Sequence, residues 1–110
     1  MRVDRAQNVY ADGELAEAMY FVNSGNVKLY AENGFPFATF RKGDNFGEQD
    51  CLLGMRRNGS ARSFELVKLY VLSLFDLEES FQGFRAVRHY LIKTAIVTQE
   101  KLLKARMNVL

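Results

Sequence analysis

A short stretch near the middle of the chain combines residue types that together can hold a phosphate and a sugar. Gly47 lets the backbone approach a ligand closely, and the short helix expected after it would present unpaired N–H groups to an anion. Arg57, nine residues after Glu48, can return to the same spot and meet two phosphate oxygens with its guanidinium group. Glu48 would repel a bare phosphate, but its carboxylate can accept a hydrogen bond from a sugar hydroxyl.

The elements that must position these residues are strands. Turn-forming pairs divide the chain before residue 75 into short apolar stretches: Asp12-Gly13, Ser24-Gly25, Asn33-Gly34, Lys42-Gly43-Asp44 and Asn58-Gly59. This punctuation predicts an all-β unit with strands at 20–22, 27–30, 35–40, 60–64 and 67–74. Asn33-Gly34 is the best hairpin turn, and Pro36 is expected near a strand start or on an edge because it cannot donate to a ladder.

After residue 74 the pattern changes to that of helices. Asp76, followed three residues later by Glu79, fits the N-cap and capping-box pair of a short helix that Gly83 would end. A longer helix follows, with one apolar stripe made by Val87, Leu91, Ala95, Thr98 and Leu102 and another made by Ile92, Ile96 and Leu103. A helix this apolar on two sides is expected to cover another part of the molecule.

Length and composition exclude several classes of protein. A chain of 110 residues holds one domain, and its net charge of +2, with both signs interspersed, gives no footprint for nucleic acid. One cysteine and one histidine, Cys51 and His89, cannot form an internal disulfide or a structural metal site. No apolar run approaches the ~20 residues of a membrane helix, and the start of the chain does not resemble a signal peptide. We therefore expect a cytoplasmic domain that lies outside the membrane and needs no metal.

The spacing of these residues resembles the phosphate-binding cassette of cyclic nucleotide-binding domains, and we call residues 46–63 the cassette. The resemblance is carried by Phe46-Gly47-Glu48, Leu52-Leu53, Arg57 and Ser60, and it extends to Met19-Tyr20-Phe21-Val22 before the cassette and residues 69–74 after it. It implies a mainly β domain spanning 1–110. Residues 1–75 would form an eight-stranded β-roll of jelly-roll topology with a short cassette helix, and 76–110 would form two helices, the last a lid.

The resemblance also assigns roles. Arg57 would pair with the cyclic phosphate of cAMP or cGMP, and Glu48 with the ribose 2′-hydroxyl. The full nucleotide-binding set would be Phe46, Gly47, Glu48, Gln49, Arg57, Asn58 and Ser60. Base contacts would come from Thr98, Lys101 and Leu102 on the last helix and from Leu29 and Ala38 on the roll.

Within the family, the chain is most similar to domains of hyperpolarization-activated and cyclic nucleotide-gated channels. This resemblance implies a ligand-gated regulatory role, with the rest of a potassium or other cation channel as partner at the cytosolic face of a membrane and a homotetramer in the full-length protein. Kinase regulatory subunits look more distant, because they usually carry proline where this chain has Arg56, but a kinase-type cAMP sensor is kept as an alternative.

Departures from the family pattern leave a second function open. Asp50 introduces a carboxylate near the expected phosphate, and Asn58-Gly59 replaces the usual pair after the arginine. These changes would suit a ligand-independent interaction module that retains the fold. An enzymatic role is not expected, because there is no nucleophile–base pair and no set of metal ligands. A transcription factor would need a further DNA-binding unit after residue 110.

Overall fold

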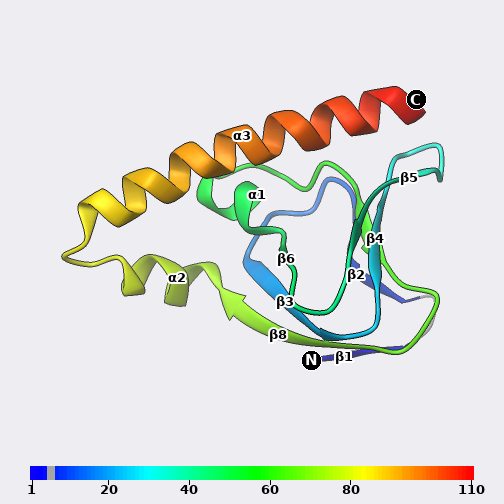
Figure 1. Ribbon diagram of the computed structural model, residues 1–110, viewed down its shortest axis with the longest axis horizontal. Coiled ribbons are helices and arrows are strands. Elements are labelled where there is room, and N and C mark those ends of the chain that lie inside the picture. The colour runs from blue at the N-terminus through cyan, green and yellow to red at the C-terminus, as the bar shows by residue number, and fades with distance from the viewer. Residues whose placement is uncertain (5–6) are drawn as a thin grey trace.

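The computed structural model describes residues 1–4 and 7–110, which form eight strands and three helices. The strands are β1 (Arg2–Val3), β2 (Asn8–Tyr10), β3 (Ala18–Ser24), β4 (Val27–Tyr30), β5 (Pro36–Phe40), β6 (Asn45–Phe46), β7 (Ser60–Arg62) and β8 (Val67–Ser73). The helices are α1 (Glu48–Leu52), α2 (Leu74–Ser80) and α3 (Arg85–Val109). Figure 1 shows the strands gathered into a roll, with α3 running across it and over α1.

The described strands pair in two antiparallel sheets. One has the order β1-β8-β3-β6 and the other β2-β7-β4-β5. Ten buried, mostly aromatic and branched apolar residues from both sheets form the core: Val3, Tyr10, Tyr20, Val22, Val27, Leu29, Phe46, Ala61, Val67 and Leu69. The expected eight-stranded β-roll with C-terminal helices is confirmed.

The longer strands follow the predicted apolar stretches closely. The strand predicted at 27–30 matches β4, and Pro36 is the first residue of β5, where a missing N–H costs no ladder bond. The Asn33-Gly34 turn connects β4 to β5, with Gly34 at a φ of 85° and the Phe35 N–H donating to the Asn33 side chain. The strands β1 and β2 were not predicted, because two or three residues are too few to show an alternating pattern.

The start of α2 differs from the prediction. Ser73 is the N-cap, and its hydroxyl accepts a hydrogen bond from the Asp76 N–H at 3.1 Å. The prediction that Asp76 caps the helix was therefore wrong by three residues, since both residue types can cap and the strand runs directly into the helix. Gly83 was expected to end this helix, but α2 ends at Ser80 with Phe81 as its C-cap, and Gly83, with a φ of 82°, lies in the turn before α3.

Phenylalanines occur both within β5 and just before it, and they do not all lie in the core. Phe37 and Phe40 pack against the core, and Phe40 stacks on Phe46 with ring centres 5.0 Å apart. Phe35 lies in the turn before β5 and is 60% exposed.

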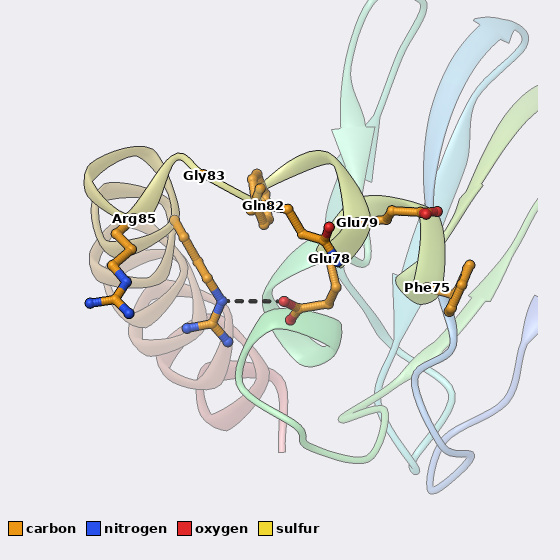
Figure 2. A pocket seen from close by; sticks show the side chains of 8 residues that line it. Phe75, Glu78, Glu79, Gln82, Gly83 and Arg85 are labelled. Atoms are coloured by element: carbon orange, nitrogen blue, oxygen red, sulfur yellow. Dashed lines mark hydrogen bonds and ion pairs between the residues drawn. The ribbon is translucent and has the colours of Figure 1, made fainter.

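The two C-terminal helices enclose a second, smaller apolar cluster. Met19, Leu77 and Phe81 are buried there, with Leu52, Leu72 and Leu91 packed against them. Figure 2 shows the hollow between α2 and the start of α3, which the ion pair from Arg88 to Glu78 crosses at 3.2 Å. The Arg88 and Glu78 side chains are 47% and 40% exposed, so solvent screens this pair and it ties the start of α3 only weakly.

Within the described part of the chain, no helix combines the length and the apolar character needed to cross a membrane.

Candidate functional site

The cassette begins where β6 ends, at a glycine whose backbone conformation suits few other residues. Gly47 precedes α1 with a φ of 82° and acts as its N-cap. A Cβ atom at this position would lie 2.8 Å from Nη1 of Arg57 and 3.5 Å from a ring carbon of Tyr10. Phe46 is buried and stacks on Tyr20 and Phe40, which holds the end of β6 in place directly before this turn. Gly47 is therefore required both by its backbone and by the arginine packed against it.

Arg57 is held inside the cassette by several fixed contacts. Its Nη1 donates to the Gly47 carbonyl at 2.7 Å, and its Nη2 donates to the Ala18 carbonyl at 2.6 Å. The guanidinium carbon lies 4.1 Å from the centre of the Tyr10 ring. Only 2% of the side chain is exposed. Its Nε is buried and has no hydrogen-bond partner among the described residues, so this donor is available to a further acceptor.

The backbone of Arg57 is equally constrained. Its N–H donates to the Glu14 carbonyl at 2.8 Å, and its carbonyl accepts from the Gly13 N–H at 2.9 Å. These bonds tie the end of the cassette to the segment between β2 and β3. The arginine is thus positioned before any ligand arrives, which lowers the entropy lost on binding.

Glu48, the first residue of α1, presents an unsatisfied acceptor beside the arginine. Its Oε2 is buried and has no hydrogen-bond partner within the described chain. Burial raises the pKa of the Glu48 carboxyl, and hydrogen bonds from its own backbone N–H and the Asn45 side chain offset part of that rise. A hydroxyl donor from a ligand would satisfy Oε2. The neighbouring Gln49 is 1% exposed, and its Nε2 likewise lacks a partner in the described residues.

Asp50 is fully buried and faces the arginine directly. Its Oδ2 lies 3.4 Å from Nη1 of Arg57, and its Oδ1 accepts a hydrogen bond from Nε2 of Gln99 at 2.9 Å. Burial raises the pKa of the Asp50 carboxyl, while the Gln99 hydrogen bond and the Arg57 charge act in the opposite direction. The neighbouring Arg56 is exposed and donates to the Gly13 carbonyl at 2.9 Å, so it takes no part in this ion pair.

Gln99 is the site residue that sequence reasoning missed. It is 4% exposed on α3, and besides contacting Asp50 it accepts a hydrogen bond from Nδ2 of Asn58 at 3.1 Å. It lies four residues after buried Ala95 and three before Leu102, so it occupies a position within an apolar stripe. A glutamine in such a stripe needs a buried polar partner, which is the signal that could have identified it.

The remaining residues of the expected site are spread more widely. Leu29 and Ala38 pair across β4 and β5, and Leu102 packs against the same core cluster. Thr98 is half-buried on α3, whereas Lys101 is exposed. The hydroxyl of Ser60 accepts from the Asp12 N–H at 3.0 Å and so ties the start of β7 to the turn after β2.

The other residues considered for chemistry have ordinary surroundings. Cys51 is buried, and its thiol donates to the Ala18 carbonyl at 3.1 Å, while His89 is exposed on α3. No group of three or more histidine, cysteine, aspartate or glutamate residues in residues 1–4 and 7–110 could hold a metal ion. The chemistry available at the site is therefore that of a fixed guanidinium beside a partnerless carboxylate oxygen.

The family model of the cyclic nucleotide-binding domain matches residues 1–83, three quarters of the chain and the whole cassette. This chain belongs to the cyclic nucleotide-binding domain family. Among curated proteins, none matches the sequence. The family assignment therefore rests on the family model and agrees with the fold.

Solved structures share this fold at low sequence identity. The cGMP-bound form of the EAL enzyme Bd1971 superposes with a TM-score of 0.77 at 18% identity, covering 98% of this chain and 30% of that one. The c-di-GMP-responsive global regulator CLP of Xanthomonas campestris superposes with a TM-score of 0.72 at 24% identity, covering 98% and 55%. The N-terminal domain of a transcriptional regulator from Streptomyces coelicolor A3(2) gives 0.70 at 20% identity, covering 92% and 74%. The chain thus spans only 30% and 55% of the first two proteins.

Proposed function

We propose that this domain binds a cyclic nucleotide, cAMP or cGMP, with Arg57 holding the cyclic phosphate and Glu48 accepting a hydrogen bond from the ribose 2′-hydroxyl. The proposal rests on two buried polar atoms of the cassette, Nε of Arg57 and Oε2 of Glu48. Neither atom has a hydrogen-bond partner among the described residues. A cyclic nucleotide supplies both missing groups, because its phosphate accepts and its hydroxyl donates. Most buried polar atoms in native proteins have a hydrogen-bond partner.

The base would lie between the roll and the last helix, against Leu29, Ala38, Thr98 and Leu102. The packing of Leu102 on the core supports this placement, because the same helix borders both the cassette and β5. Lys101 would have to turn inward from its exposed position to reach a base. We propose that Asn58, Gln49 and Ser60 line the rest of the site.

We further propose that binding moves α3 and so regulates an attached effector rather than performing catalysis. The Gln99 contacts support this, since one side chain on α3 touches both Asp50 and Asn58 of the cassette. A ligand acts only through its different affinity for two arrangements of such an element. A channel, with the tetramer and membrane-proximal cytosolic location that it implies, rests on the sequence resemblance alone, and a kinase-type sensor is the alternative effector.

A ligand-independent interaction module is the second candidate function. One observation favours it: Asp50 already lies against the arginine that would hold the phosphate. In that case the cassette would keep the family fold without binding a nucleotide, and the buried charges of Asp50 and Arg57 would neutralise each other.

A thermal melt with and without millimolar cAMP or cGMP separates the two functions. A ligand that binds only the folded chain raises the melting midpoint, so we expect an increase with at least one nucleotide. Arg57→Lys keeps the charge but loses the planar fork, and it should weaken binding by about tenfold or more in calorimetry. Arg56→Lys, at the exposed neighbouring position, is the matched control and should bind as wild type. No shift with either nucleotide would favour the ligand-independent module.

A further inference from the structure

Asp50 lies against Arg57, the residue proposed to hold the nucleotide phosphate. Its carboxylate approaches Arg57 Nη1 at 3.4 Å while the same nitrogen donates to the Gly47 carbonyl. Both partners of this ion pair are almost completely buried, with 2% and 0% of the side chains exposed. Solvent therefore screens the pair little, and a second anion brought to Arg57 would meet the Asp50 charge at short range.

The same carboxylate also holds the C-terminal helix. Gln99 donates to Asp50 Oδ1 at 2.9 Å and accepts from Asn58 at 3.1 Å, so it joins α3 to both ends of the cassette. At the start of α3, by contrast, residues 82–90 are exposed and the Arg88–Glu78 pair lies in the open hollow of Figure 2. Among the described residues, Gln99 makes the hydrogen bonds that we find from α3 to the cassette. The polar contacts that α3 makes through Arg106 and Val109 reach Asp12 and Asn33, outside the cassette.

We propose that Asp50 is an internal competitor of the nucleotide phosphate: it neutralises Arg57 and, through Gln99, latches α3 onto the cassette. We call this set of contacts the latch, made by Asp50, Arg57, Gln99 and Asn58. Phosphate binding at Arg57 places a second negative charge beside Asp50. The Asp50 carboxylate must then move away or take up a proton, and either change alters its hydrogen bond with Gln99. The latch thereby couples the phosphate site to α3 by direct contact, and this regulatory role rests on the proposed nucleotide binding.

The first test measures nucleotide affinity by titration calorimetry on the whole chain. Asp50→Asn removes the charge and keeps an oxygen that can accept from Gln99, so cAMP or cGMP should bind about fivefold tighter or more, within the usual range of coupling between sites. Glu100→Gln removes an exposed carboxylate from the adjacent position of α3 and should leave affinity within about twofold of wild type. A purely structural role for Asp50 predicts weaker binding in the variant, not tighter binding.

The second test needs no ligand. Gln99→Leu removes the amide from α3 at nearly constant volume, and hydrogen exchange should then accelerate at the amides of residues 95–103 by about fivefold or more, because local opening becomes easier. Asp50→Asn should preserve most of that protection, which separates the charge from the hydrogen bond. Unchanged exchange in Gln99→Leu would overturn the latch whatever the nucleotide results.

The outcomes distinguish the latch from the function on which it rests. If wild type binds nucleotide and Asp50→Asn binds no tighter, the latch is wrong and nucleotide binding stands. If neither wild type nor Asp50→Asn binds cAMP or cGMP, the proposed function is wrong and the regulatory role of the latch falls with it. If only Asp50→Asn binds, both proposals are supported, because the internal carboxylate alone then blocks the site.

Discussion

Substituting Gly47 by alanine tests whether the cassette turn and Arg57 act as one unit. Two separate costs are expected. A left-handed backbone at a φ of 82° costs an alanine about 1–2 kcal/mol relative to its preferred conformations. The new Cβ would also lie 2.8 Å from Arg57 Nη1, which has little room to retreat because the guanidinium packs on Tyr10.

The second cost can be worked from the contact that must yield. Arg57 Nη1 donates to the Gly47 carbonyl at 2.7 Å, and a hydrogen bond from a charged group contributes about 1.5–3 kcal/mol. Gly47→Ala should therefore lower the free energy of unfolding by about 2.5–5 kcal/mol in all. Displacing the guanidinium should also weaken nucleotide binding about tenfold or more, since every 1.4 kcal/mol is one factor of ten.

Gly34→Ala is the matched control for backbone strain. Gly34 has nearly the same φ, 85°, but a Cβ built there meets no atom within 4 Å. This variant should lose only the ~1–2 kcal/mol of strain and bind nucleotide as wild type. Urea denaturation measures the first quantity and calorimetry the second. Equal losses of stability in the two variants would refute the coupling of Gly47 to Arg57.

Three further predictions concern single groups. Glu48→Gln should raise the urea midpoint, because burial raises the pKa of the Glu48 carboxyl and a neutral amide costs less to bury than a carboxylate. The same change should weaken nucleotide binding, because an amide oxygen is a poorer acceptor for a ribose hydroxyl than Oε2 of Glu48. A lower urea midpoint would contradict the first expectation. Ser73→Ala should lower the free energy of unfolding by about 1 kcal/mol, because it removes the N-cap hydroxyl that accepts from the Asp76 N–H. Urea unfolding measures this loss, and an unchanged stability would indicate that Asp76 caps the helix instead. Burial raises the pKa of the Asp50 carboxyl, so between a pH of about 3.8 and that raised pKa the folded chain binds a proton that the unfolded chain has released. The contribution of Asp50 to the free energy of unfolding should therefore fall as the pH rises through this range. Urea midpoints measured from pH 4 to 7 should therefore decline more steeply in wild type than in Asp50→Asn, and parallel curves would show that Asp50 has no raised pKa.

Local sequence signals predicted those parts of the fold that neighbouring residues control. Alternating apolar residues located β4, the Asn33-Gly34 pair located its hairpin to β5, and the recurrence of apolar residues at three and four positions located α3. The strands β1 and β2 escaped prediction because each has only two or three residues, too few to show an alternating pattern. The cap of α2 was misplaced because serine and aspartate both suit an N-cap, and only the end of β8 decides between them.

The features of the cassette also fall into those that the sequence predicted and those that only the folded structure shows. The sequence by itself determined the family, the β-roll with its helices, and the candidate pair Glu48 and Arg57, because the glycine, the carboxylate and the arginine must keep a fixed spacing along one short segment. Only the tertiary structure decided that Asp50 faces Arg57 and that Gln99 joins α3 to the cassette. Asp50 and Gln99 are 49 residues apart, and their contact depends on how α3 rotates when Ala95 and Leu102 pack against the rest of the fold. That rotation is set by long-range burial of apolar surface, which no local spacing encodes.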